Sequence, residues 1–173
     1  MKTMMVTGHR PSKLLGGYGK FSPGRIALRD KMAEILRSEK PDLAISGMAL
    51  GVDQDFAETA LVLGIPLLAA VPFKGQEATW PIESRILYHD LLRGAHRIVV
   101  VSEGGYSAEK MMKRNAWMVN QLTEKDDACL AVYDGSRGGT ENCVKYAQSR
   151  GKRMIFLDPR SLVHETVADD TPY

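Results

Sequence analysis

Short apolar runs alternate along this chain with longer segments in which apolar residues recur every three or four positions. The short runs predict strands and the recurring pattern predicts helices. The expected strands are residues 3–6, 43–45, 67–71, 97–101, 128–133 and 153–157. Strands that alternate with helices indicate an α/β fold, a doubly wound and mostly parallel sheet of about six strands with helices on both faces.

Helix ends are marked by the residues that usually stand there. Ser22-Pro23 is a typical helix start, Pro41 forces an end before it, and Gly64 is a typical residue after a last turn. The expected helices are residues 23–40, 52–63, a third after 80–81, 108–122, 139–150 and a short one near 160–167. The strand at 97–101, Arg-Ile-Val-Val-Val, is nearly all β-branched, which predicts a strand buried on both faces.

The length of 173 residues and the ordinary composition, 44% hydrophobic and 25% charged, fit one domain. We expect a single domain over 1–173 with a short polar tail from about residue 158. The longest apolar stretch, 65–73, is too short to span a bilayer, and no charged and apolar leader opens the chain. A cytoplasmic protein without a membrane partner is therefore expected.

The net charge gives no evidence for nucleic-acid binding but does not exclude it, and the two cysteines argue against a metal site. A formal net charge of +2 is too small to indicate nucleic-acid binding by itself. Cys129 lies in a strand and is expected to be a buried, reduced thiol. Neither Cys129 nor Cys143 has a second cysteine or a histidine at metal-ligand spacing, so no metal site and no cofactor are expected.

Two glycine-rich turns follow expected strands and open expected helices. They are residues 46–53, Ser-Gly-Met-Ala-Leu-Gly-Val-Asp, and 134–142, Asp-Gly-Ser-Arg-Gly-Gly-Thr-Glu-Asn. Glycine allows a backbone to approach a ligand closely, and a helix N-terminus favours an anion. Neither turn has the Walker or dinucleotide pattern, which disfavours P-loop hydrolysis and NAD chemistry. A phosphate-bearing ligand, most simply a nucleotide, is predicted at the carboxyl edge of the sheet.

Each turn supplies candidate ligand-binding residues. In the second turn Gly138, Gly139 and Thr140 are expected to contact phosphate, with Arg137 beside them. In the first turn the candidates are Ser46, Gly47, Gly51 and Asp53. Asp53 stands at a helix start, where a carboxylate complements the dipole. It could equally bind ribose hydroxyls or act as an acid or base, and both interpretations stay open.

Other candidates lie on the first loop and on the fourth helix. Asn115 shares a stripe with Met111, Met118 and Leu122, so its amide needs a hydrogen-bonding partner, either a loop or a ligand. Arg114 could clamp phosphate, although a surface arginine is slightly favoured.

In the first loop, Gly8 and Arg10 are expected at the ligand, with Arg10 as an anion contact. Structural hydrogen bonding is the favoured role of His9.

These motifs together resemble one family. They are Val6-Thr7-Gly8-His9-Arg10-Pro11, the turn at 46–53, Val71-Pro72-Phe73 with Gln76, Arg114-Asn115, and Tyr133-Asp134-Gly135 with Gly138-Gly139-Thr140. The chain resembles the YpsA-like branch of the SLOG superfamily, to which the DNA-processing protein DprA and the Lonely Guy phosphoribohydrolases are related. The resemblance implies a Rossmann-like fold, a nucleotide pocket and a role for Gly51 and Asp53. A homodimer through exposed helix faces is also implied.

This sequence matches the family's binding residues better than the catalytic residues of the Lonely Guy enzymes. Lonely Guy enzymes use a P-G-G-x-G-T-x-x-E motif whose glutamate serves cleavage of an N-glycosidic bond. Gly139-Thr140 matches its G-T, but Cys143 stands at the position of that glutamate and Asp134-Gly135 replaces the proline. A hydrolase would need Asp53 or Glu141 as its catalytic carboxylate.

Three functions follow, in order of preference. The first is a module that senses or sequesters a nucleotide-like small molecule, such as a nucleoside phosphate or an ADP-ribose-like compound. The alternative is an N-glycosidic hydrolase or transferase acting on a nucleoside monophosphate. Nucleic-acid binding as in DprA ranks last, because the helix at 23–40 carries five basic against three acidic residues and is only mildly basic.

Overall fold

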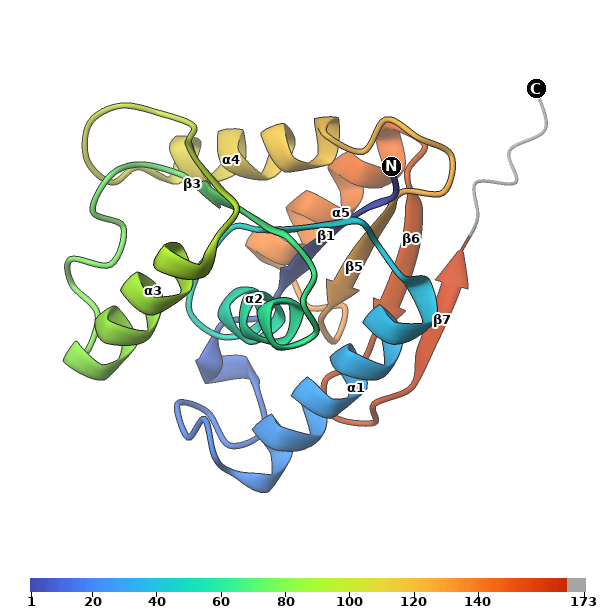
Figure 1. Ribbon diagram of the computed structural model, residues 1–173, viewed down its shortest axis with the longest axis horizontal. Helices are drawn as coiled ribbons and strands as arrows, with labels where there is room; N and C mark the ends of the chain where they lie inside the picture. The colour runs from blue at the N-terminus through green and yellow to red at the C-terminus, as the bar shows by residue number, and fades with distance from the viewer. Residues whose placement is uncertain (168–173) are drawn as a thin grey trace.

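A computed structural model describes residues 1–167 as a seven-stranded sheet between two layers of helices (Figure 1). The strand order is β4-β3-β2-β1-β5-β6-β7, and all neighbours are parallel except β6 and β7. The strands are β1 (Thr3–Gly8), β2 (Leu43–Ser46), β3 (Leu67–Val71), β4 (Arg97–Val100), β5 (Ala128–Val132), β6 (Arg153–Leu157) and β7 (His164–Val167). The expected α/β class is confirmed.

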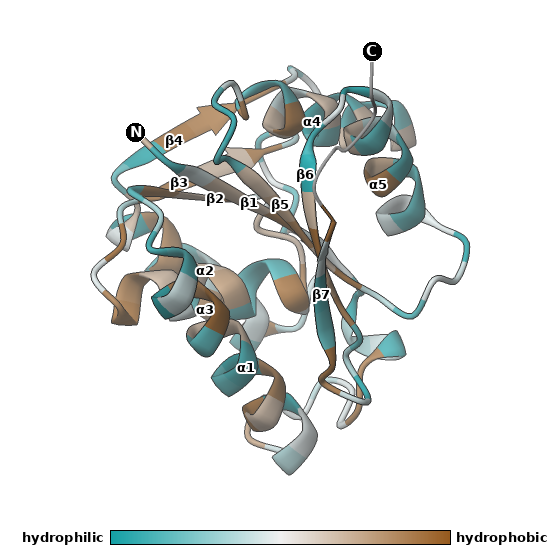
Figure 2. Ribbon diagram, turned by 90° about the vertical axis from the view of Figure 1, so that its right-hand side faces the viewer, coloured by the Kyte–Doolittle hydropathy of each residue, from teal (hydrophilic) through white to brown (hydrophobic). Residues whose placement is uncertain are grey.

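Five α-helices and one 3₁₀ turn connect these strands. They are η1 (Pro11–Lys13), α1 (Pro23–Glu39), α2 (Val52–Val62), α3 (Ile82–Gly94), α4 (Ala108–Asn120) and α5 (Gly139–Ser149). Helices α1, α2 and α3 lie on one side of the sheet, and α4 and α5 lie on the other (Figure 2). None of the helices within residues 1–167 is long and apolar enough to cross a bilayer.

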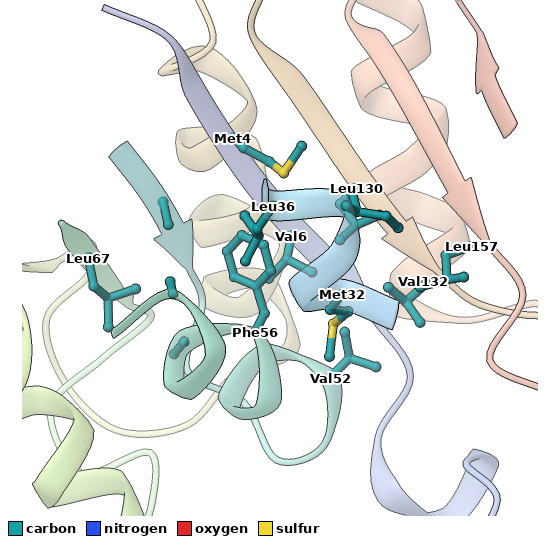
Figure 3. Close-up of a cluster of buried hydrophobic side chains, with 14 of the residues drawn as sticks. Met4, Val6, Met32, Leu36, Val52, Phe56, Leu67, Leu130, Val132 and Leu157 are labelled. Atoms are coloured by element: carbon teal, nitrogen blue, oxygen red, sulfur yellow. The ribbon is translucent and has the colours of Figure 1, made fainter. Parts of the chain in front are cut away.

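Alternation along the central strands builds one apolar cluster on each side of the sheet. Consecutive residues of a strand point to opposite faces, so Met4 and Val6 face one layer of helices and Met5 faces the other. The cluster under α1 and α2 includes Met4, Val6, Met32, Leu36, Phe56 and Leu130 (Figure 3). Cys129 belongs to the opposite cluster as a buried free thiol, as expected.

The expectation that residues 97–101 form a strand buried on both faces is wrong. β4 is the edge strand next to β3, and the side chains of Ile98 and Val100 are 49% and 50% exposed. They share a face with their partners Ala69 and Val71 of β3, and within residues 1–167 β4 has a neighbouring strand on one side alone. An apolar β-branched run can form an edge strand as well as a central strand, because the composition of a strand does not determine its position in the sheet.

The expected short helix near 160–167 is also wrong, because β7 occupies His164–Val167 and adds a seventh strand. A turn precedes it, in which the carboxylate of Asp158 accepts hydrogen bonds from the N–H groups of Arg160 (2.8 Å) and Ser161 (3.0 Å). This turn reverses the chain, so that β7 runs antiparallel to β6. The rest of the expected polar tail lies outside the described residues.

A cluster of charges ties α1 to two strands at the edge opposite to the glycine-rich turns. Glu39 at the end of α1 accepts two hydrogen bonds from Arg153, at 2.8 and 2.9 Å, and one from Lys2 at 2.8 Å. The hydrogen bonds from Arg153, helped by Lys2, lower the pKa of Glu39 from 4.5 to about 2 despite its partial burial. The ionised form of Glu39 therefore stabilises the fold.

We expect Glu39→Gln to lower the melting temperature at pH 7 by about 2–4 °C, because the neutral amide loses the two ion pairs. The stabilisation is fully present above about pH 4.5, the ordinary pKa of the group, and is lost as the pH falls towards 2. The difference between variant and parent should therefore shrink in melting curves recorded at pH 2.5. Glu34→Gln, at an exposed residue of the same helix paired with Lys31, is the control. A difference that does not depend on pH would contradict this account.

Candidate functional site

A cavity of about 250 Å³ lies at the carboxyl edge of the sheet, between β1 and β5. The chain leaves β1 towards β2 and leaves β5 towards β6, on opposite sides, so this is the position where connections of the sheet diverge. Four segments line the cavity, with Thr7–Arg10, Ser12, Lys13, Ala49, Asp53, Met111, Arg114, Asn115 and Ser136–Thr140. The lining residues include the candidates Gly8, Arg10, Asp53, Arg114, Asn115, Gly138, Gly139 and Thr140.

The N-terminus of α5 forms one wall. Gly138 is the N-cap residue, at φ +148° and ψ −162°, a backbone conformation that residues with a Cβ rarely adopt. Because glycine has no capping side chain, the first N–H groups of α5 have neither an intrahelical partner nor a side-chain cap. Gly139 and Thr140 bring these donors to the cavity, where the helix dipole favours an anion.

Arg114 is buried at 3% exposure, so the preference for a surface arginine is wrong. Its guanidinium donates to the carbonyl of Gly47 and, at 3.4 Å, to the carbonyl of Ala70. Its Nε donates to Oδ1 of Asn115 at 2.9 Å, which leaves the amide NH₂ of Asn115 available at the cavity. The helical spacing could have predicted this burial, because residue 114 lies one turn before Met118, which is buried.

Asp53, at 6% exposure, is the carboxyl group of the cavity wall. Its Oδ2 accepts a hydrogen bond from the N–H of Ala49 at 3.3 Å. Burial raises its pKa, an effect that the positive charges of Arg114 and Arg10 oppose. Such a carboxyl holds a proton more readily than an exposed aspartate does, which suits either a hydrogen bond to a sugar hydroxyl or acid catalysis.

Three candidates do not line this cavity but support residues that do: Ser46, Gly47 and Gly51. The Ser46 hydroxyl is fully buried, donates to the carbonyl of Asp53 at 2.7 Å and accepts from the N–H of Met48 at 3.1 Å. A Cβ on Gly47 would lie 2.5 Å from Nη1 of Arg114, so the missing side chain makes room for the guanidinium. Met48 next to it has φ +61°, uncommon for a residue with a side chain.

Gly51 makes its close approach to another loop. It has φ +91°, and an added Cβ would lie 2.6 Å from the carbonyl oxygen of His9. The N–H of Val52 donates to that same carbonyl at 3.2 Å, so the start of α2 is fixed directly against the loop after β1. The sequence predicted a close approach of Gly51 to a ligand, whereas the close approach that the structure shows is between two backbone segments.

His9 and Lys13 join the loop after β1 to the loop after β5. Nε2 of His9, a buried side chain, lies 2.9 Å from Oδ1 of Asp134 and 3.1 Å from its backbone nitrogen, and its hydrogen bond to the carboxylate confirms structural hydrogen bonding. Hydrogen bonds from Ser136, helped by His9, hold the pKa of Asp134 well below its usual range. Lys13 donates to Oγ of Ser136 at 3.0 Å and to the carbonyl of Arg137 at 3.2 Å.

Several lining residues were not predicted to face the ligand: Thr7, Ser12, Lys13, Ala49, Met111 and Ser136. Lys13 could have been predicted as a site residue, because it belongs to the short polar segment that follows β1 and contains Arg10. Met111 was assigned to an apolar stripe of its helix, and the structure places it where that stripe reaches the cavity.

The second candidate acid lies outside the cavity. The carboxylate of Glu141 pairs with Lys145 one turn further along α5, at 3.2 Å. Cys143 is 2% exposed, and burial raises the pKa of its thiol to about 11 although a hydrogen bond with Thr7 opposes the shift. A neutral thiol does not replace a catalytic carboxylate. Within residues 1–167 no three His, Cys, Asp or Glu side chains gather closely enough to hold a metal ion.

We expect Gly51→Ala to cost at least about 3 kcal/mol of folding free energy, because it adds a clash with the loop after β1 to the strain of a positive φ. Gly135→Ala is the matched control, since Gly135 has φ +84° with open space around it and should cost only about 1–2 kcal/mol. Urea unfolding of both variants measures the difference. Equal losses would mean that the close approach at Gly51 contributes nothing.

Two comparisons of sequence identify relatives of this chain. Residues 4–162 match the model of the family described as the YspA SLOG family. YoqJ, an uncharacterized SPbeta prophage-derived protein of Bacillus subtilis (strain 168), is 33% identical over 160 residues, covering 80% of this chain and 91% of that protein. A UPF0398 protein of Bacillus anthracis (strain A0248) is 30% identical over 183 aligned positions, covering 95% of this chain and 96% of the relative.

A comparison of structures gives the same fold. DNA processing protein A (DprA) from Streptococcus pneumoniae superposes with a TM-score of 0.64 at 15% sequence identity. The match covers 93% of this chain and 53% of the DprA chain, so this chain spans about half the length of that protein. With the family model matching nearly the whole described chain, the protein belongs to the YspA SLOG family, as its motifs predicted.

Proposed function

We propose that the protein binds a nucleotide or a nucleotide-derived anion in the cavity between β1 and β5, as a sensor or a sequestering module. The charge of the cavity carries this proposal. Four cationic side chains line it, those of Arg10, Lys13, Arg114 and Arg137. Among the described lining residues Asp53 is the one carboxyl group, and burial raises its pKa. An excess of positive charge beside a helix N-terminus favours a phosphate group.

The polar groups of the cavity suggest how such a ligand would lie. Its phosphate would accept hydrogen bonds from the first N–H groups of α5 and from Arg137 and Lys13. The free amide NH₂ of Asn115 and the carboxyl of Asp53 also line the cavity and suit a sugar or a base. The volume of about 250 Å³ lies just below the roughly 300–1,000 Å³ of cavities that hold drug-sized ligands, so a ligand no larger than one nucleotide is favoured over a dinucleotide.

The hydrolase remains the alternative because Asp53 faces the cavity with a raised pKa, which suits a general acid. It is less favoured, because Glu141 is paired with Lys145 away from the cavity. Nucleic-acid binding ranks third, and the DprA-like fold and SLOG membership are its support. A homodimer stays a prediction of the family resemblance.

A thermal-shift series with nucleoside mono-, di- and triphosphates and ADP-ribose tests the binding proposal. A ligand at about 100 times its Kd adds about 2.7 kcal/mol of stability, which raises the melting temperature measurably. We expect Arg137→Ala to weaken binding of the best ligand about tenfold or more, because a charge-assisted hydrogen bond contributes roughly 1.5–3 kcal/mol. Arg137 is exposed, so its loss should leave the fold intact.

Arg150→Ala is the control, since Arg150 is equally exposed but lies at the far end of α5. If no nucleotide-like anion stabilises the protein, or if both variants lose affinity equally, the proposed site is wrong.

Incubation of the protein with the best-binding nucleoside monophosphate, followed by chromatography for free base, separates binding from hydrolysis. We expect no base to accumulate, because Asp53 alone would have to serve as both acid and base. Release of base that Asp53→Asn abolishes, while the variant still binds the nucleotide, would establish the hydrolase in place of the binding module.

A further inference from the structure

A groove of about 370 Å³ lies between α4 and α5, next to the cavity between β1 and β5 (the first cavity). The two helices pack side by side (Figure 1). Asn115 of α4 lines both spaces. On α5, Thr140 lines the first cavity, and Cys143, nearly one turn later, lines the groove. The groove therefore continues from the first cavity along the outer side of both helices.

The groove is apolar and carries no uncommitted charge. Its apolar walls are one face of each helix, with Met112 and Ala116 on α4 and Cys143 and Tyr146 on α5. The hydroxyl of Tyr146 donates to Oδ1 of Asn120 at 3.1 Å, which ties the aromatic ring to α4. The two charged residues of the described lining, Glu109 and Lys113, pair with each other at 3.4 Å. An uncharged group in this groove would therefore meet apolar contacts and no unpaired ion.

Asn115, where the two spaces meet, offers hydrogen-bond donors alone. Nε of Arg114 can only donate, so the hydrogen bond of 2.9 Å identifies the atom of Asn115 that receives it as Oδ1. The amide NH₂ is the group that remains for a ligand. Asn115 is half-buried and lines both spaces, so this NH₂ is within reach of a ligand that occupies them. The matching group on the ligand is an acceptor, such as a ring nitrogen or a carbonyl oxygen.

Charge is distributed unevenly over the two spaces. The first cavity combines arginines with the N-terminus of α5, which favours an anion, whereas the groove favours an uncharged group. A nucleotide has the same distribution, with a charged phosphate at one end and an uncharged planar base at the other. Gly139 and Cys143 are separated by about 6 Å along α5, since an α-helix rises about 1.5 Å per residue. A single sugar can span this distance.

We propose that the groove between α4 and α5 receives the base of the nucleotide whose phosphate lies at the N-terminus of α5. The assignment depends on the anion binding proposed for the first cavity. The base packs against Met112 and Tyr146, and one of its acceptor atoms faces the NH₂ of Asn115. The first cavity alone is smaller than the roughly 300–1,000 Å³ of cavities that hold drug-sized ligands, and the groove supplies the additional space.

Isothermal titration calorimetry with AMP and with ribose 5-phosphate, which has no base, tests this assignment. We expect AMP to bind at least tenfold more tightly, because its base is removed from water in the groove. Ala116→Phe, which fills the groove, should lower the affinity for AMP to that for ribose 5-phosphate. Met112→Ser should weaken AMP binding at least threefold, and Met112 is 58% exposed, so the fold should not depend on it.

Both variants should bind ribose 5-phosphate as the parent does, which also shows that they are folded. Gln148→Phe is the control, because Gln148 is exposed on α5 and lines neither space. It should change neither affinity.

The outcomes separate the base site from the anion site. Equal affinities of the parent for AMP and ribose 5-phosphate would overturn the base site and leave the anion site supported. A preference for AMP that Ala116→Phe and Met112→Ser both leave unchanged would also place the base elsewhere. If neither compound binds, the proposed anion site is wrong, and the base site is rejected with it.

A preference for AMP that the two groove variants reduce, while Arg137→Ala weakens both compounds equally, supports both sites.

Discussion

Two buried carboxylates in the first turn of α2 organise the carboxyl edge of this sheet. Asp53 faces α4, where Arg114 supplies the nearest buried positive charge. Asp55 faces α1 and pairs with Arg25 at 2.8 Å and with Arg29 at 3.4 Å. Removing a charge from water is costly unless an opposite charge and hydrogen bonds replace the hydration. Each carboxylate therefore requires the helix on its own side to sit at a defined place, and the cavity beside Asp53 takes its shape from that requirement.

Glycines make this close packing of charged groups possible. Gly47 leaves room for the guanidinium of Arg114, and Gly51 lets the start of α2 touch the loop after β1. Neither residue lines the first cavity, yet both set the positions of residues that do. The first glycine-rich turn thus acts through the backbone and side chains that it brings together, whereas Gly138 and Gly139 of the second turn line the cavity themselves.

Local patterns were sufficient for the class of fold and for most of the segments that meet at the site. The apolar runs gave the parallel strands, and their carboxyl ends gave the loops that line the first cavity. These local patterns could not predict long-range packing. Composition did not reveal that β4 lies at an edge, and a turn around Asp158 outweighed a weak helical pattern. Arg114 was missed as a buried residue because its partners, the carbonyls of Gly47 and Ala70, are far away in the sequence.

The tie between His9 and Asp134 spans 125 residues, and that between Lys13 and Ser136 spans 123. Their chain segments meet when β5 pairs with β1, a step that carries a large loop-closure entropy because the two strands are far apart in the sequence. The first cavity is consequently absent from any partly folded chain that lacks β5. A ligand that binds this cavity would stabilise the native state relative to such intermediates, and its binding free energy would add to the free energy of unfolding.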